Sequence, residues 1–286
     1  MRKTVHLIAS DDAGWMLPLF EPAHEKWSRT RLGQLGMPDQ TQQRAMGEVA
    51  RALDAEGPMT RNALRQWLRS KGIELDQQTG LHVVGLATVS GIACQGPDIG
   101  ASPSLVRREE WLGKPPRFDR DKALAELARR YLRGFGRATD RDFARWSGLA
   151  LRELRKGLEA IAGELTETRV GEEIMLSLKG AAPRLPRRGR LRLLGAFDTY
   201  LLGYASRDFL ISAGHGRMVN AARGGMIEPA IARDGEILGL WTMSRSKKRL
   251  EIRLDPFEPL GAAELEAIDA EVADIGRFEG LEATLG

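Results

Sequence analysis

Between residues 121 and 178 the apolar positions keep a helical period three times and then change to a strand-like pattern. From Leu124 to Phe135 they recur at three- and four-residue steps, which indicates one buried helix face. Three helices followed by a two-stranded ribbon is the order of a winged helix, whose third helix usually enters the DNA major groove. The later runs cover 139–147, 150–162, 165–170 and 174–178.

Local start and stop signals support these boundaries. Thr139 stands where an N-cap belongs and Asp142 follows three residues later, a capping box with Asp in place of Glu. Gly134 and Gly136 are expected to end the first helix, and Gly171 to join the two strands.

Residues 36–108 repeat this plan with different side chains. Asp39 is expected to cap a first helix that Gly57 ends, and Thr60 a second that closes at Gly72. The third helix is predicted at 78–90, with wing strands at 92–95 and 105–107.

The first 35 residues look like the remnant of a preceding region. Residues 5–8 alternate like a strand, and Asp11 can cap a following helix. Pro18 falls inside that helix and should kink or shorten it.

After residue 182 the period changes toward strands. The connector 183–192 is rich in arginine, and Asp234-Gly235 has the composition of a hairpin turn. The predicted fold class is therefore α+β, with tandem winged helix-turn-helix domains followed by a β-rich C-terminal module that ends in a helix. Strands are predicted at 191–197, 227–232, 237–243 and 250–254 and a helix at 262–274, and the domains at 1–35, 36–112, 119–182 and 190–286.

Composition narrows the class of protein. The net charge is +4 and the isoelectric point about 9.4, which permits a nucleic-acid partner without requiring one. No apolar run reaches the ~20 residues of a membrane helix. A lone Cys94 fits a reducing compartment, so a cytoplasmic location is expected. The histidines lack ligand spacing and no phosphate-binding glycine loop is present, so no metal and no cofactor are expected.

Four stretches stand out in order along the chain. They are 2–7, 131–148 with Phe143-Ala144-Arg145-Trp146-Ser147-Gly148, 197–204 with Phe197-Asp198-Thr199-Tyr200, and 234–241. Together they resemble bacterial winged-helix proteins of the AlkZ/YcaQ type, although that family tends to have a proline where this chain has Thr199. The resemblance implies a relative of DNA glycosylases that excise alkylated bases and unhook interstrand crosslinks.

The resemblance also implies three winged helices, the first carrying a Gln-aliphatic-Gln/Asp catalytic motif. This chain is expected to begin after that motif, so the catalytic residues remain unknown. Gln40-Thr41-Gln42 imitates the motif, but its middle residue is polar and it opens a helix of the next domain.

Breaking an N-glycosidic bond needs a group that positions water or stabilises positive charge on the sugar. His6 and Asp198 are the candidates for a cleft. For Asp198, bonding to neighbouring backbone amides or pairing with Arg207 is favoured over catalysis. For His6, a hydrogen-bonded structural role is likewise favoured.

Three basic groups are candidate DNA contacts, because phosphate contacts dominate affinity for DNA. The first lies on the helix 150–162, although the wing that follows is acidic. The second lies in the connector and the third in the hairpin 244–249, and these two favour binding without sequence preference. The candidates are Arg152, Arg155, Lys156, Arg187, Arg188, Arg190, Arg245, Lys247, Lys248 and Arg249.

The sequence therefore predicts a protein that binds duplex DNA, intact or damaged, and that lacks the catalytic motif of its glycosylase relatives. A winged-helix transcription regulator and a non-enzymatic interaction scaffold remain alternatives. A regulator would read sequence through Arg152 and Arg155, whereas a scaffold would lack a continuous positive groove.

Overall fold

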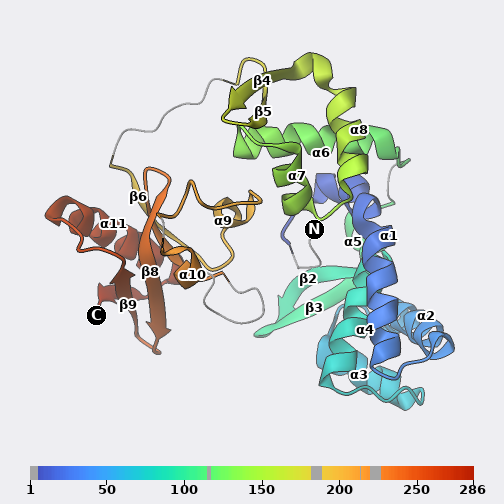
Figure 1. Cartoon of the computed structure of the whole chain (residues 1–286). Helices are drawn as coiled ribbons and strands as arrows, with labels where there is room; N and C mark the ends of the chain where they lie inside the picture. Colours follow the sequence, from blue (N-terminus) through green and yellow to red (C-terminus); the bar gives the residue numbers. More distant parts are fainter. Residues whose placement is uncertain (1–5, 115–116, 182–188, 213, 220–226) are drawn as a thin grey trace. The chain divides into compact units, whose positions relative to one another are not determined.

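The computed structural model describes residues 6–114, 117–181, 189–212, 214–219 and 227–286. It is a mixed α and β structure with two compact units (Figure 1). The first unit comprises residues 1–128 and 148–162, and the second comprises 129–147 and 163–286. Helix α6 begins in the first unit and ends in the second.

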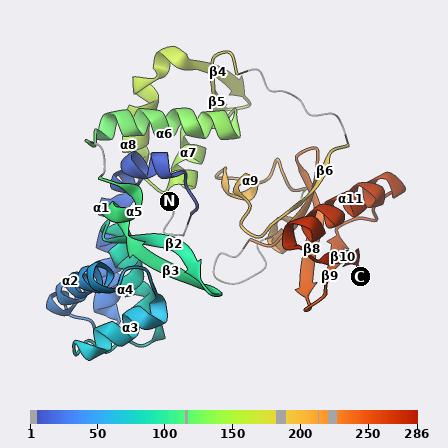
Figure 2. The same ribbon diagram turned by 180° about the vertical axis from the view of Figure 1, so that it is seen from behind.

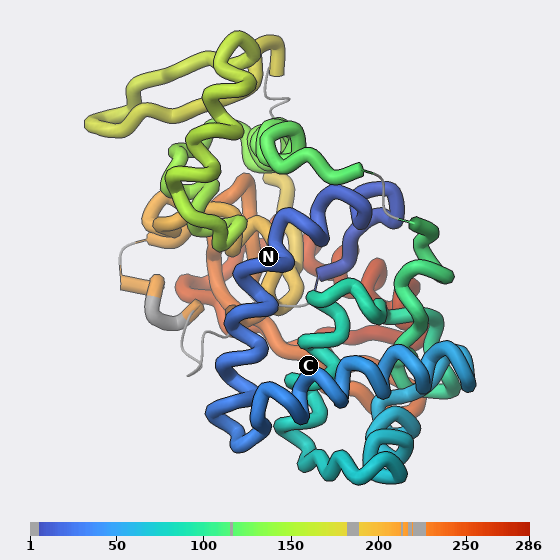
Figure 3. The backbone as a smooth tube through the Cα atoms, turned by 90° about the vertical axis from the view of Figure 1, so that its right-hand side faces the viewer, coloured from blue at the N-terminus to red at the C-terminus, as the bar shows by residue number. Residues whose placement is uncertain are grey.

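The first unit opens with the long helix α1 (Ser10–Gln34), which packs against α4. Pro18 and Pro22 both lie inside α1, which is traced in blue in Figure 3, so of the two predicted effects of Pro18 the shortening does not occur. Burial of Leu19 and Phe20 offsets the backbone hydrogen bonds that proline removes. The N-cap position is Ala9 rather than Asp11, which lies in the first turn and still faces the positive end of the helix dipole.

The predicted strand at 5–8 is not formed in its described part. His6, Leu7 and Ile8 belong to no helix or strand, and the side chain of Leu7 is fully exposed. The alternating pattern alone cannot make a strand, because a strand also needs a partner for its backbone hydrogen bonds.

Four further helices and a small sheet follow α1 in the first unit. Thr60 caps α3 by accepting a hydrogen bond from the amide of Ala63, and Asp76 caps α4 by accepting one from Thr79. Their apolar faces share one core with α2. The elements are α2 (Asp39–Glu56), β1 (Met59–Thr60), α3 (Arg61–Ser70), α4 (Gln77–Val89), β2 (Ala93–Ile99), β3 (Ser102–Arg107) and α5 (Arg108–Leu112), with sheet order β1-β3-β2.

The first unit also holds the start of α6 (Arg120–Phe135) and all of α8 (Leu151–Ala160). These helices approach closely at Gly157, where an added Cβ would lie 2.6 Å from the carbonyl oxygen of Leu124. Glycine is therefore required at this crossing by the neighbouring backbone.

The second unit begins with the end of α6, then α7 (Asp140–Ser147) and the hairpin β4 (Leu165–Val170) and β5 (Glu173–Leu178). The predicted capping box is confirmed. Asp142 Oδ2 accepts hydrogen bonds from the amide and hydroxyl of Thr139, both at 2.8 Å, and the Thr139 hydroxyl accepts one from the amide of Asp142 at 3.0 Å.

An aromatic cluster holds this part of the second unit to residues 203–205. Tyr131 is fully buried, stacks on Phe143 at 4.8 Å, and donates to the carbonyl of Gly203 at 2.8 Å. The other carboxylate oxygen of Asp142 accepts from the amide of Ala205 at 2.8 Å. Burial raises the pKa of Tyr131 well above its usual range, so its hydroxyl stays a donor.

A five-stranded sheet of order β10-β9-β8-β7-β6 completes the second unit (Figures 1 and 2). Its strands alternate side chains between two cores, so that Ile231 faces α11 while Ala230 and Ala232 face the other side. Asp234 and Gly235 both have positive φ and form the predicted hairpin turn. The elements are β6 (Leu191–Leu194), α9 (Thr199–Leu202), α10 (Gly216–Val219), β7 (Ala230–Arg233), β8 (Glu236–Arg245), β9 (Arg249–Pro256), α11 (Ala262–Glu279) and β10 (Glu282–Leu285).

Candidate nucleic-acid interface

The hairpin between β8 and β9 ends in three exposed cations, Lys247, Lys248 and Arg249, which we call the basic tip. The hydroxyl of Ser246 accepts hydrogen bonds from the amides of Lys248 and Arg249, at 3.4 and 3.1 Å. The backbone of the turn is thus held in one shape. No side chain of the basic tip forms an ion pair within the described part of the chain, so all three charges are available to a polyanion.

Arg245 differs from the basic tip, although only Ser246 separates it from Lys247. Its guanidinium forms an ion pair with Glu279, near the end of α11. A cation that already faces a carboxylate gains less from a phosphate. Of the predicted hairpin residues, Arg245 is therefore the weakest candidate.

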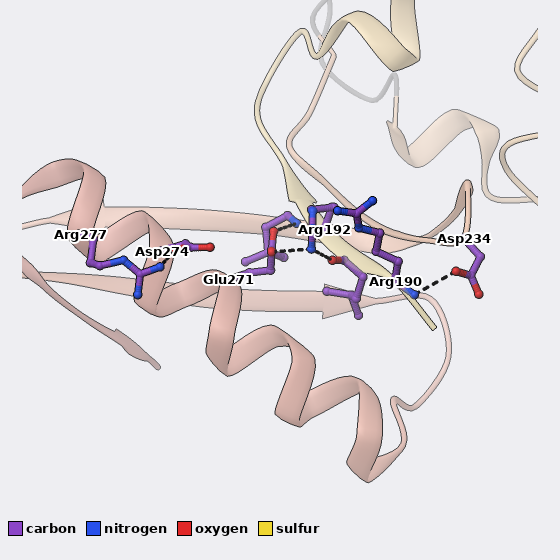
Figure 4. Close-up of polar contacts among 8 residues, drawn as sticks. Arg190, Arg192, Asp234, Glu271, Asp274 and Arg277 are labelled. Atoms are coloured by element: carbon purple, nitrogen blue, oxygen red, sulfur yellow. Dashed lines mark hydrogen bonds and ion pairs between the residues drawn. The ribbon is translucent and has the colours of Figure 1, made fainter. Parts of the chain in front are cut away.

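The connector is only partly described, since Arg187 and Arg188 lie outside the described residues. The backbone amide of Arg190 donates to Asp234 at 2.9 Å, while its side chain is exposed. Arg192 pairs with Glu271 of α11 at 2.9 Å (Figure 4). Charge in this arginine-rich stretch is thus partly neutralised.

The sheet places the start of β6, where the described part of the connector lies, at the end opposite the basic tip (Figure 1). Strand β6 begins at Leu191, which pairs with Arg233 beside the turn that opens β8, whereas the basic tip follows the end of β8. Strand β8 has ten residues, so the two ends lie about 30 Å apart. In their described parts the connector and the basic tip therefore do not form one continuous surface.

Helix α8 in the first unit carries Arg152, Arg155 and Lys156, and all three side chains are exposed. Between them Glu153 turns aside and pairs with Arg120 at 2.7 Å. The acidic neighbour is thus occupied within the fold, and the cations remain on the surface.

Asp198 is a helix cap. Its carboxylate accepts a hydrogen bond from the amide of Tyr200 at 2.8 Å, at the start of α9. This is the favoured structural role, in its backbone-amide form rather than as a pair with Arg207. The preceding residue, Phe197, has a φ of 58° and an exposed side chain.

Gln42, the second glutamine of the run that imitates the family motif, has a structural role. Gln42 is fully buried, and its amide nitrogen donates to the carbonyl oxygens of Met37 and Arg29, at 2.9 and 3.2 Å. A side chain that ties two backbone segments together in this way cannot orient water on a nucleic acid.

His6 lines a pocket of about 490 Å³ inside the first unit. The wall comes mainly from α1, α4 and β3. It includes Phe20, His24 and Trp27, which recur at four- and three-residue steps on one face of α1. Sequence reasoning missed this pocket, although that aromatic spacing was visible in the printed sequence.

Burial raises the pKa of Glu21 in the wall of this pocket, although the positive charge of Arg108 partly opposes the shift. Among the described residues, no group of three or more His, Cys, Asp or Glu side chains could hold a metal ion. In the same residues no helix has the length and apolar character to cross a bilayer.

Comparison with known proteins identifies the family. Residues 1–278 match the family model described as DNA glycosylase AlkZ-like. The chain is 29% identical over 302 residues to an interstrand DNA cross-link repair glycosylase of Streptomyces sahachiroi, covering 98% of this chain and 78% of that protein.

The solved structure of the Streptomyces sahachiroi DNA glycosylase AlkZ resembles this fold, with a TM-score of 0.74 at 25% sequence identity. The match covers the whole of this chain and 80% of that one. The family model, the sequence match and the structural match thus agree, and the chain belongs to the AlkZ-like family of DNA glycosylases.

Proposed function

We propose that this protein binds duplex DNA without sequence preference, and that the residues for base excision are not in this chain. The observation that carries the proposal is the basic tip, whose three cations are exposed and unpaired within the described residues. Membership of the AlkZ-like family supports DNA as the polyanion.

The order of elements supports two tandem winged helices within the domains predicted from the sequence. The first would comprise α2, α3, α4, β2 and β3, and the second α6, α7, α8, β4 and β5. In a winged helix the third helix commonly faces DNA. We therefore assign Arg152, Arg155 and Lys156 of α8 a secondary role in contacting phosphates.

The absence of catalysis is part of the proposal. Gln42 is committed to backbone carbonyls and Asp198 to a helix cap, so neither is available to activate water. On a duplex that carries an alkylated base, the chain should bind and release no base. Base release above the rate of spontaneous loss would show that the catalytic residues are present after all.

The test of binding is a salt titration with a labelled duplex of arbitrary sequence. Each lysine that contacts a phosphate contributes about one unit to the slope of log affinity against log salt. Lys247→Ala/Lys248→Ala should therefore weaken binding and reduce that slope by about two units. The loss should be the same for unrelated duplex sequences.

The matched control is Arg253→Ala/Arg277→Ala. It removes the same charge from the same unit, but Arg253 pairs with Glu251 and Arg277 with Asp274. We expect the control to keep most of the affinity and slope. Equal losses in both double variants would mean that net charge, rather than the basic tip, determines binding, and a slope near zero in the unmodified protein would refute DNA binding itself.

A further inference from the structure

A second, more polar hollow adjoins the pocket of the first unit. It has a volume of about 240 Å³ and lies between α3, the start of α4 and β3. Both hollows are lined by Arg61, Leu81, Val84 and Pro103, so they share one wall. The two hollows therefore adjoin each other along this wall.

The two hollows differ in chemistry. The larger one, the apolar pocket, is lined by Phe20, Trp27, Val84 and Leu105, and its volume lies within the range of about 300–1,000 Å³ of small-molecule sites. Aromatic walls of this kind favour a planar ring, which stacks or packs edge-on against them. Trp27 is already set edge-on to the ring of His82, at 5.7 Å.

The smaller one, the polar hollow, carries positive charge from Arg61 and Arg65, one turn apart on α3. Both side chains are exposed, and neither pairs with an acid in the described part of the chain. The acid in that wall, Asp76, is committed to the cap of α4, where it accepts from Thr79 at 2.6 Å. A guanidinium pair of this type suits a phosphate or carboxylate.

One buried polar atom in the wall is unsatisfied. Ser104 lies on β3 with 1% of its surface exposed, and its hydroxyl has no hydrogen-bond partner among the described residues. Such an unpaired group is unfavourable, and a heteroatom on the ring would satisfy it once the side chain turns toward the pocket.

We propose that the apolar pocket and the polar hollow form one binding site for a planar heteroaromatic ring that carries an anionic group, as in a nucleoside monophosphate. The ring lies against Phe20 and Trp27, and the anion lies on Arg61 and Arg65. The ligand is either a free nucleotide or a nucleotide turned out of a DNA strand, since both present the same chemistry. The site does not depend on the basic tip, and it is tested separately from it.

Gly85 offers a direct way to fill the site. It lines the apolar pocket from the middle of α4, and an added Cβ there would meet no atom within 4 Å. Gly85→Leu therefore occupies the pocket without a backbone clash. The matched control is Gly33→Leu, because Gly33 is a helical glycine of α1 with equally open surroundings and lines neither hollow.

The experiment is isothermal titration calorimetry of the full chain with adenosine monophosphate, adenosine and inorganic phosphate. Adenosine monophosphate should bind more tightly than either fragment. Gly85→Leu should weaken it at least about tenfold, equivalent to about 1.4 kcal/mol, and Gly33→Leu should not. Arg61→Ala/Arg65→Ala should weaken the nucleotide to the level of adenosine while leaving adenosine itself unchanged.

Competition distinguishes the two sources of the ligand. If a duplex with one unpaired adenine displaces the nucleotide and a fully paired duplex does not, the ligand is a turned-out base. If neither duplex displaces the nucleotide, the ligand is a free nucleotide. No binding of adenosine monophosphate, or equal binding by Gly85→Leu, overturns the proposal. Should Gly85→Leu lower the melting temperature, the double arginine variant decides the question, since both of its side chains are on the surface.

Discussion

Asp142 connects two parts of the second unit through one buried side chain, and its removal should destabilise the protein more than the loss of an ordinary helix cap. One carboxylate oxygen accepts from the amide and hydroxyl of Thr139, and the other accepts from the amide of Ala205, 63 residues away. The side chain of Asp142 has 8% exposure, so water replaces these acceptors poorly.

The magnitude follows from counting the donors left behind. Loss of a cap costs about 1 kcal/mol, and each buried donor without a partner costs about 1–3 kcal/mol. Asp142→Ala loses the cap and also the acceptor of the Ala205 amide. Because this bond is only partly buried and Ala205 is exposed, the free energy of unfolding should fall by about 2 kcal/mol. Thr139→Ala loses its own part of the capping box and should cost about 1 kcal/mol.

The assay is equilibrium denaturation of the full chain in urea, comparing midpoints at unchanged slope. Asp142→Asn is the isosteric control, because it keeps one acceptor oxygen and turns the other position into a donor. Its loss should lie between those of the two alanine variants. If Asp142→Ala and Thr139→Ala cost the same, the bond to Ala205 contributes nothing and the reasoning is refuted.

Two further variants test packing and burial. In thermal melts Gly157→Ala should destabilise the protein despite a gain in helix propensity of about 1 kcal/mol, because the new methyl group meets the backbone of Leu124 at 2.6 Å. The control is Gly134→Ala on α6, where an added Cβ has no atom within 4 Å, and it should be neutral or stabilising in the same melts. Glu21→Gln should raise stability at neutral pH, because burial raises the pKa of Glu21 and penalises its charged form. Since stability is lost as pH rises from the unfolded pKa through the folded one, the benefit should vanish below about pH 4.5, and a benefit that persists in acid would contradict this cause.

Features encoded by neighbouring residues could be predicted from the sequence. The capping box of Thr139 and Asp142, the cap at Thr60 and the turn at Asp234-Gly235 were all recognisable, because each depends on residues within three positions. The number and order of helices in the central region followed from the same kind of signal.

Long-range pairing could not be predicted in this way. Nothing near Arg192 indicates that its partner is Glu271, and nothing in β6 or β8 alone reveals that their basic ends point apart. The four-residue strand β10 is too short to show a period, and its parallel pairing with β9 depends on the sheet being present. The prediction of a strand at 5–8 was wrong for a related reason. Its alternating pattern could be recognised from neighbouring residues, but a strand also needs a pairing partner from elsewhere in the chain.

Helix α11 neutralises the sheet it covers. Three of its carboxylates each form an ion pair with an arginine from a different strand. Within the described residues, the cations of the basic tip between β8 and β9 have no such partner. The pairs are Glu271 with Arg192 of β6, Glu264 with Arg233 of β7, and Glu279 with Arg245 of β8.

Helix α11 therefore supplies the counter-charges for these three arginines from within the same chain. Any polyanion that approaches this surface competes with carboxylates held at high effective concentration, so weak and diffuse attraction is suppressed there. The protein can thus keep a basic isoelectric point without attracting polyanions over its whole surface.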